Sequence, residues 1–494
     1  MPILCPRLVN VLRILWVTVV VWYELGTFFY HVASCPWPDT SLLSSTGPSP
    51  THILIVADPQ VLDHRSYPDR GAWLMLFSQL MVDLNLRKSW RAAMRMRPDA
   101  VVFLGDMMDD GRFAMSDEEY ESYYRRFRSI FKTDDSLPSY YLPGNHDIGL
   151  GSSYLFSNDA RERYISHFGP LNQQIEIANH TLLLVDALKL VEEDQQRARS
   201  GVSYAHWAAA MPGGTIEFVQ TFATDEDHSP VVLFLHVPLA RPEGTSCGPR
   251  RERGTIRQGT GFGYQNTLSS QASQFLLQGT RPSIVFSGDD HDYCEYVHTI
   301  APTEGTKLSR PISVLEVTVK SFSMAMGVHR PGYQLLSLIP TSDIPLTTEA
   351  SLAHTLVFSR IKSESIFRYT YRCSWPLLSC SSSQAWVVHV RGIVERPTFE
   401  LTNRKPDVSY ALPLPSSSRS ERRTAWTRSW TFSLGGRRRR ITLSSGLFVS
   451  LLSCLCTKAS DRSRQGFLRG FLLDVCDVAW APVLLFAVIA CWAF

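Results

Sequence analysis

The sequence predicts a layered α/β domain between two membrane-spanning segments. Short β-branched runs alternate with helical stretches from residue 52 to about 300, and an apolar stretch stands near each end of the chain. The length of 494 residues exceeds one typical domain and excludes a small disulfide-stapled module. A net charge of +3, from 49 Lys+Arg against 46 Asp+Glu, gives no global sign of a nucleic-acid partner, and we expect none.

The N-terminal apolar stretch covers residues 14–33 and is long enough to cross a bilayer. Arg7 and Arg13 precede it, so residues 1–13 are expected to stay cytosolic and the following domain to be lumenal or extracellular. An uncleaved signal anchor is favoured over a cleavable signal peptide, because no A-x-A-like site follows. The stretch contains one acid, Glu24, which is either a functional intramembrane group or the partner of a polar neighbour.

The remaining chain divides by composition. Residues 34–51 are predicted to be a lumenal linker, 52–340 the folded domain, and 341–440 an irregular extension rich in Ser, Arg and Pro. Residues 441–494 form a C-terminal membrane region. The segment from Leu472 to Phe494 is predicted to form one membrane span, and Ile441 to Cys456 is a second candidate. The sequence is therefore compatible with either one or two C-terminal spans.

Six predicted strands end in polar residues, and this repetition is the main signal in the sequence. The runs have no polar alternation, as is typical of strands buried on both faces. In such sheets ligands collect at the carboxyl ends of the strands. The six segments are His52–Gln60, Ala100–Asp110, Ser139–Asp147, Thr181–Asp186, Val231–His236 and Ser283–Asp292.

Two helical stretches between these strands have clear signatures. Residues 70–96 carry an apolar stripe of the kind found on amphipathic helices, formed by Leu74, Phe77, Leu80, Met81 and Leu84. A second helix is predicted over residues 117–131. It opens with Ser116 followed three residues later by Glu119, which is a capping-box pattern.

The polar residues at the strand ends form a candidate metal site. Carboxylates and imidazoles without thiolates suit Mn²⁺, Fe²⁺ or Zn²⁺, and two cations with one shared carboxylate could activate water and bind a phosphoryl group. A single Asp after a strand is most often a turn or N-cap residue, so Asp186 alone carries no such meaning. We expect six residues to form one metal site together: Asp58, Asp106, Asn145, His236, Asp289 and His291.

These segments resemble the calcineurin-like metallophosphoesterase superfamily, whose ordered signature is D-x-H, G-D-x-x-D, G-N-H-E/D, an isolated H and G-H-x-H. The resemblance covers residues 52 to about 300 and implies a sandwich of two mixed β-sheets flanked by helices. It implies that Asp58 and His291 hold a first metal, that Asp106 bridges, and that Asn145, His236 and Asp289 hold a second. His146 would be the general acid or transition-state stabiliser, oriented by Asp109.

Two positions depart from the superfamily signature. Gln60 stands where the motif has a His and would be a weaker ligand, and Asp289 replaces the first His of G-H-x-H. The added carboxylate favours Mn²⁺ over Zn²⁺ or Fe²⁺. Both departures are usual in one branch, that of the fungal cell-division-control type and its animal relatives, which the segments A-D-P-Q and S-G-D-D-H-D also resemble.

The branch resemblance implies a specific activity. Its members are membrane enzymes of the endoplasmic reticulum (ER), ER exit sites or early Golgi with lumenal catalytic domains. They remove an ethanolamine-phosphate side branch from a mannose of glycosylphosphatidylinositol (GPI) anchors, a step linked to export of GPI-anchored proteins. The substrate would be a GPI-anchored protein or GPI glycolipid in the bilayer. Two alternatives remain: a lumenal phosphatase acting on another phosphoester, and a catalytically degenerate cargo adaptor.

Three smaller features bear on a lumenal location and on the substrate. The sequon Asn179-His180-Thr181 would be glycosylated in the lumen. Residues 250–266 form either a lid over the substrate or a solvated loop. Disulfides are expected, with a connectivity that the sequence leaves open, among Cys35, Cys247, Cys294, Cys373 and Cys380.

Overall fold

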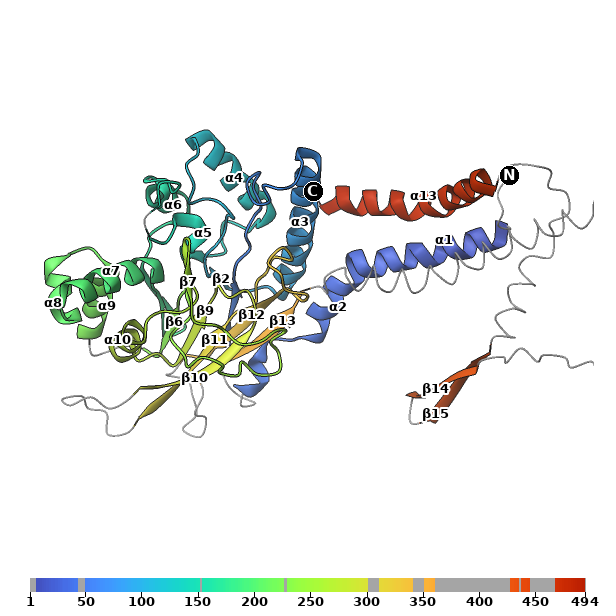
Figure 1. Cartoon of the computed structure of the whole chain (residues 1–494). Helices are drawn as coiled ribbons and strands as arrows, with labels where there is room; N and C mark the ends of the chain where they lie inside the picture. The colour runs from blue at the N-terminus through green and yellow to red at the C-terminus, as the bar shows by residue number, and fades with distance from the viewer. Residues whose placement is uncertain are drawn as a thin grey trace, which may run out of the picture. The chain divides into compact units, whose positions relative to one another are not determined.

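The computed structural model describes most of the chain in two compact units (Figure 1). One unit comprises Met1–Val21 and Phe367–Val488, and the other Trp22–Ile366 and Ile489–Phe494. The described residues are 6–42, 49–151, 153–225, 229–300, 311–340, 351–359, 427–434, 437–444 and 467–493.

The larger unit contains two mixed sheets, as the resemblance implied. In the five-stranded sheet β1 pairs in parallel with β2, and β2 with β3. Strand β12 pairs in antiparallel fashion with both of its neighbours, β1 and β13. Its order is β13 (Leu352–Phe358), β12 (Gly332–Leu338), β1 (Thr51–Val56), β2 (Ala100–Phe103) and β3 (Ser139–Tyr141).

In the six-stranded sheet β5, β6, β9 and β11 are parallel, and β4 and β10 are antiparallel edge strands. All six predicted strands are therefore present, and β4, β10, β11, β12 and β13 add to them. The order is β10 (Cys294–Ile300), β11 (Ile312–Thr318), β9 (Ile284–Ser287), β6 (Val231–Phe234), β5 (His180–Leu184) and β4 (Gln173–Ile177).

The period-two alternation of the strands sends their side chains into two different cores. On β1, Ile53 and Ile55 enter the layer between the sheets with Phe234 and Phe286 of the other sheet. The alternate residues on β1 belong to the core beneath the helices. Both faces of each central strand are thus dry, which explains why the predicted runs are continuously apolar.

Helices cover the outer faces of the sheets (Figure 1). On the five-stranded sheet, Trp90 of α3 (Ala72–Ala93) contacts Phe103, and so does Phe127 of α4 (Asp117–Ile130). The predicted cap of α4 is present, since Ser116 accepts a hydrogen bond from the Glu119 amide at 3.2 Å. The remaining helices of this unit are η3 (Met94–Met96), α5 (Asn145–Ile148), α6 (Ala160–Phe168), α7 (Ala187–Ser200), α8 (Tyr204–Ala210), α9 (Thr215–Thr224) and α10 (Ser270–Thr280).

The N-terminal apolar segment is helical and is followed by residues that contact the domain. It comprises α1 (Pro6–Val21), a π-helical turn η1 (Trp22–Gly26) and α2 (Thr27–Ser34), followed by a 3₁₀ turn η2 (Pro38–Ser41). Trp37 stacks on His52 at 4.2 Å, and Asp39 accepts a hydrogen bond from Ser337 at 2.6 Å. The described part of the predicted 34–51 linker is therefore packed onto the domain.

Among the described residues, two helical segments are long and apolar enough to cross a membrane: Pro6–Ser41, and Leu472–Ala490 within α13 (Phe467–Ala493). In the smaller unit Arg13 of α1 pairs with Asp477 of α13 at 2.9 Å. The predicted irregular extension at 341–440 is corrected in part, because residues 352–358 form β13. Residues 427–434 and 437–444 form the hairpin β14–β15, so the second candidate span at 441–456 begins in a strand, and its remainder lies outside the described residues.

Candidate metal centre

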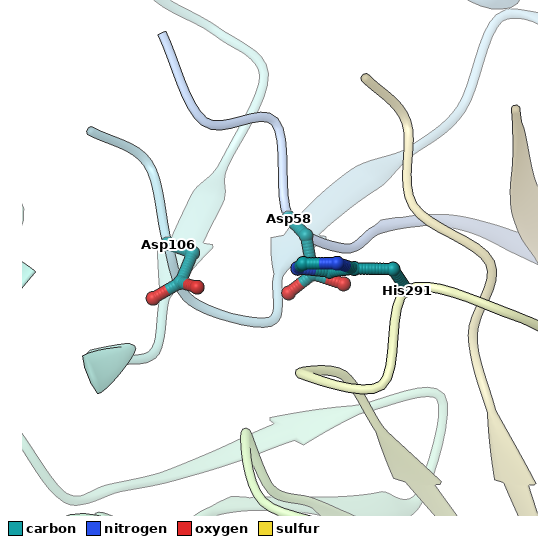
Figure 2. Close-up of side chains that lie close together, drawn as sticks. All are labelled: Asp58, Asp106 and His291. Atoms are coloured by element: carbon teal, nitrogen blue, oxygen red, sulfur yellow. The ribbon is translucent and has the colours of Figure 1, made fainter. Parts of the chain in front are cut away.

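The predicted ligand residues come together where the two sheets present the carboxyl ends of their parallel strands. Asp58 follows β1, Asp106 follows β2, and His291 follows β9. Figure 2 shows these three side chains reaching a common space from three separate loops. Asn145 follows β3 and His236 follows β6, so five strands from both sheets supply the site.

Two overlapping groups of side chains are close enough to hold metal ions. One contains Asp58, Asp106 and His291, the other Asp106, His236 and Asp289, and within each group the ligand atoms lie within 4.8 Å of one another. Asp106 belongs to both groups, as expected of a bridging carboxylate between two cations. The grouping agrees with the roles implied by the resemblance, although the ligand roles themselves remain predictions.

The backbone at these positions is strained. Asp58, Gln60, Asp106, Asp289 and His291 all adopt positive φ values, from 37° to 66°. Left-handed conformations at residues other than glycine cost on the order of 1–3 kcal/mol each and persist where the surrounding structure enforces them. Because five of the nine such residues in the described chain surround this one site, the strain is concentrated where the ligands must be aimed.

Two glycines allow the loops to approach one another closely. A Cβ at Gly144 would lie 2.0 Å from Asp106 Oδ1, and a Cβ at Gly105 would lie 2.4 Å from His236 Nδ1. Gly105 also has a φ of +96°, which an L side chain rarely adopts. Both glycines are therefore required by space, and Gly105 is also required by its backbone conformation.

His236 is oriented to present a lone pair to the site. Its Nδ1 lies 2.6 Å from the Leu104 carbonyl oxygen, which can only accept, so Nδ1 carries the proton. Nε2 then faces Asn145 Oδ1 at 3.1 Å, Asp106 Oδ1 at 3.4 Å and Asp289 Oδ1 at 3.6 Å. Because three acceptor oxygens lie this close to Nε2, a positive charge is required between the nitrogen and the oxygens, either a proton or a metal cation.

The electrostatics of the site follow from this crowding. Burial is the largest influence on His236 and disfavours its charged form, but Asp106, Asp289 and Asp58 together raise its pKa to about 9. Burial raises the pKa of Asp289 to about 7 and that of Asp58 well above its usual value. Burial lowers the pKa of His291 to about 4, so this imidazole keeps its lone pair at neutral pH.

Asp58 and Gln60 each have a buried polar atom that the protein leaves available. Asp58 Oδ1 accepts from the Asp289 amide at 3.1 Å, whereas Oδ2 has no hydrogen-bond partner among the described residues. Gln60 donates from Nε2 to Asp106 Oδ2 at 2.8 Å, which leaves its buried Oε1 without a partner in the same part of the chain. An unpaired buried carboxylate oxygen is costly, and a bound cation would satisfy it. The donor set therefore fits a dinuclear metal site.

His146 lies at the edge of the site, where a leaving group could reach it. Its Nδ1 donates to the Asp109 carbonyl oxygen and lies 3.4 Å from Asp109 Oδ1. Nε2 is therefore the nitrogen available for proton transfer. Asp109 thus contacts and orients His146, and the catalytic roles that the resemblance implied for the two residues remain predictions.

A cleft of about 340 Å³ opens over the metal ligands. It is lined by Asn145, His146, Asp289, Asp290, His291, Arg112, Phe262, Tyr264 and Asn266. The last three belong to or follow the hairpin of β7 (Thr260–Gly261) and β8 (Tyr264–Gln265), and the Gly263 carbonyl accepts from Asn145 Nδ2 at 3.0 Å. The hairpin is thus fixed to a predicted ligand, which supports the lid interpretation of residues 250–266.

Ion pairs hold the first part of this lid in place. Arg251 binds both carboxylate oxygens of Asp290, with the longer contact at 3.1 Å. Lys320 lies 2.8 Å from Glu252 and 2.6 Å from Asp292. Arg251 and Glu252 are therefore held in place, whereas Arg250 and Arg253 are exposed. Arg112 was not predicted as a site residue, because no spacing pattern in the sequence links it to the ligands, whereas Phe262 and Tyr264 lie in the segment predicted as a possible lid.

Two buried carboxylates, neither of them predicted as a site residue, brace the ligand loops. Asp147 accepts from the amides of Met108 at 3.1 Å and Gly144 at 2.9 Å, and so joins the loops after β2 and β3. Glu316 accepts from the Leu239 amide at 3.0 Å and the Ser287 hydroxyl at 2.8 Å. It thereby joins the segments after β6 and β9 in the other sheet.

Two predicted lumenal features have defined places in the fold. Cys247 and Cys294 form a disulfide, whereas Cys373 and Cys380 lie outside the described residues. Asn179 occupies the tight turn between β4 and β5 with a φ of 54° and is exposed. Glycosylation of Asn179 remains a prediction.

Comparison with known proteins agrees with the geometry. Residues 51–293 match the family model for calcineurin-like phosphoesterases. These residues therefore form a calcineurin-like metallophosphoesterase domain, and the pair of ligand groups around Asp106 is its candidate metal centre.

Several curated relatives share most of the described domain. Cell division control protein 1 of Saccharomyces cerevisiae is 33% identical over 69% of this chain, and the match spans 66% of that protein, slightly under two thirds of its length. Metallophosphoesterase 1 of Mus musculus is 24% identical over 74% of this chain and 92% of the relative. Metallophosphoesterase 1 of Danio rerio is 26% identical over 59% of this chain and 76% of the relative.

Proposed function

We propose that the protein is a membrane-anchored, metal-dependent phosphodiesterase that removes an ethanolamine-phosphate branch from a mannose of GPI anchors. The observation that carries the proposal is the sharing of Asp106 between two ligand groups at the floor of a cleft that His146 also lines. This arrangement suits hydrolysis of a phosphoester whose leaving group is an alcohol. The similarity to Cell division control protein 1 and Metallophosphoesterase 1 supports the choice of branch.

The chain's own residues have distinct roles in this reaction. Two divalent cations, with Mn²⁺ favoured by the carboxylate of Asp289, would supply an activated water and neutralise phosphoryl charge. His146 Nε2 donates a proton to the mannose oxygen as its bond to phosphorus breaks. Water supplies the oxygen that phosphorus gains, so the products are ethanolamine phosphate and a free mannose hydroxyl. Asp109 keeps the imidazole aimed at the leaving oxygen.

The cleft suits a glycan phosphodiester. Phe262 is 58% exposed and Tyr264 46% exposed on the β7–β8 hairpin, so their rings are available to pack against a sugar. The guanidinium of Arg112 and the amide of Asn266 provide hydrogen-bond donors on the same wall for phosphate and hydroxyl oxygens.

A lumenal site in the ER, at ER exit sites or in the cis-Golgi is part of the proposal. The Cys247–Cys294 disulfide supports an oxidising compartment, and the basic residues before the first span support a cytosolic N-terminus. A GPI glycolipid or GPI-anchored protein would reach the site within the same membrane.

The test is release of ethanolamine phosphate from defined GPI glycans by the purified full-length protein with Mn²⁺. We expect release from one mannose position, and His146→Ala should slow it by about 10²–10⁴-fold while both metals stay bound. His206→Ala, on the exposed side of α8, is the matched control and should leave the rate unchanged. Hydrolysis of a generic phosphodiester without any release from GPI glycans would overturn the substrate and retain the chemistry. Failure to bind metal would instead favour the adaptor alternative.

A further inference from the structure

The first half of α3 exposes a patch of large apolar side chains. Trp73 is 87% exposed, Leu76 58% and Phe77 57%. Leu74 and Leu80 complete the apolar patch at 55% and 38%. With about 3.6 residues per turn, these five side chains fall within about 160° of the helix surface. The second half of α3 is mostly buried in the domain, so the patch is confined to the end of the helix that projects from the core.

The end of the N-terminal apolar helix packs on the second half of α3, within the same compact unit. Glu24 of η1 forms a buried ion pair with Lys88, whose ammonium also lies 5.6 Å from the Phe28 ring centre. Arg95 lies over the Phe29 ring at 4.2 Å. Helix α3 is therefore attached directly to the segment by which the chain leaves the membrane.

Neighbouring side chains indicate the level of the bilayer surface. Tyr30 is 58% exposed and Trp22 50%, and such aromatic residues near the end of a span are typical of the membrane–water interface. Tyr30 adjoins Phe28, which contacts Lys88 of α3, and Phe29, which contacts Arg95 of the following turn η3. Arg91 of α3 and Arg95 of η3 are exposed and lie about three and four turns beyond the patch on roughly the same face, where cationic side chains would meet lipid phosphates.

We propose that α3 lies in the membrane interface, with the apolar patch inserted among the lipids of the bilayer that the N-terminal helix spans. The helix connects the parallel strands β1 and β2, so it runs antiparallel to them and begins at their carboxyl ends. Asp58 and Asp106 lie at that same edge. The patch therefore holds the metal-centre edge of the domain against the bilayer surface, where a lipid-linked phosphodiester is presented. This inference depends on the membrane anchor and not on the identity of the substrate.

Photocrosslinking of the full-length protein in phospholipid nanodiscs tests the proposal. A photoreactive benzoylphenylalanine replaces Phe77 or, as the matched control, Ile165, which is 46% exposed on α6. Irradiation should add the mass of one phospholipid at position 77, at least about tenfold more often than at position 165. Equal lipid addition at the two positions would overturn the proposal. So would a predominant crosslink from position 77 to a peptide of α13 or to a second copy of the chain.

The readout is independent of catalysis, so it separates this inference from the proposed function. In the same nanodiscs, Trp73→Ser combined with Phe77→Ser should reduce hydrolysis of a bilayer-embedded phosphodiester and spare hydrolysis of a soluble one. Equal hydrolysis of the embedded substrate by the wild-type and double-variant proteins would contradict a role for the patch in substrate access. Loss of the soluble activity as well would indicate damage to the fold and would also count against the proposal.

Discussion

The two sheets brace their halves of the metal centre with different buried carboxylates. Beside the five-stranded sheet Asp147 binds two backbone amides, and no cationic side chain of the described residues lies within hydrogen-bonding distance of it. In the six-stranded sheet Glu316 binds one backbone amide and one hydroxyl, and also Arg241 and His298 at 2.7 Å each. One half is therefore held by neutral donors and the other by a compensated cluster of charges.

The consequence appears in the ionisation of the two groups. Burial is the largest influence on both, and for Asp147 it raises the pKa to about 7, with the nearby charge of Asp106 adding to the effect. For Glu316 burial is outweighed by Arg241 and His298, which hold its pKa below the ordinary value of 4.5. The comparison shows that two carboxylates with the same bracing role can respond to pH in opposite directions.

The largest expected effect comes from the residue at which the two halves meet. Asp106→Asn removes the shared carboxylate, so both ligand groups weaken. We expect turnover of a phosphodiester to fall by at least about 10³-fold and bound metal to drop from two ions to less than one. Metal content by mass spectrometry and initial rates check this. Asp135→Asn, at an exposed position, is the control, and retention of two metals by Asp106→Asn would refute the bridging role.

Removing the charge of Glu316 should destabilise the half of the metal centre that the six-stranded sheet supplies. Glu316→Gln leaves the buried Arg241 guanidinium without its counterion, and loss of one partner from a buried pair typically costs about 3–5 kcal/mol. Chemical denaturation measures the loss. The double variant Glu316→Gln with Arg241→Met should recover part of the stability, whereas no recovery would show that the charge pairing is not the cause.

Removing the charge of Asp147 should be milder. Asp147→Asn keeps one acceptor for the two amides but replaces the other with an NH₂ donor, and an unsatisfied buried donor costs about 1–3 kcal/mol. The free energy of unfolding should fall by that amount, with a smaller loss than in Glu316→Gln. A loss equal to or greater than that of Glu316→Gln would reverse the comparison between the two sheets.

The smallest expected effect is on the pH dependence of stability, measured after a chelator has removed bound metal. This measurement distinguishes most sharply between the two carboxylates. Asp147 has an ordinary pKa of 3.8 and a folded pKa of about 7. Between these values the folded state binds more protons, so the contribution of Asp147 to stability falls as pH rises. Glu316 has a lowered folded pKa, so its contribution is present above 4.5 and is lost as pH falls through the folded pKa.

Thermal unfolding between pH 4 and pH 8 distinguishes the two contributions. Asp147→Asn should flatten the decline toward neutral pH, whereas Glu316→Gln should flatten the decline on the acid side. Identical pH profiles for the two variants would show that the bracing groups do not titrate as their surroundings indicate.

Much of the fold could be read from the sequence because its central strands are dry on both faces. Continuous apolar runs such as residues 53–56 and 231–234 are typical of strands that are buried on both faces, and all six predicted strands are present. The missed strands are different. Residues 294–300 and 312–318 mix polar and apolar side chains and contain no continuous apolar run, and β13 lies beyond the segment that the composition indicated as folded.

Helix α3 shows the limit of the same reasoning. Its stripe of Leu74, Phe77 and Leu80 has the spacing of a core-facing helix, yet these residues are exposed and only the continuation at Leu84 is buried. Periodicity identifies an apolar face but not the medium that covers it. The ion pair between Glu24 and Lys88, which ties this helix to the membrane segment, joins residues 64 positions apart and leaves no local signal.

The sequence by itself determined the kinds of atom available to the metal centre. Each predicted ligand follows a strand, and parallel strands must bring their carboxyl ends to one edge. The resemblance already implied that Asp106 would be shared. Only the tertiary structure decided that Gln60 would donate to Asp106, and that Asp147 and Glu316 would brace the two halves. These contacts depend on the directions of the side chains and on which loops meet. They join segments that are far apart in the sequence, and separation along the chain does not show which segments are close in space.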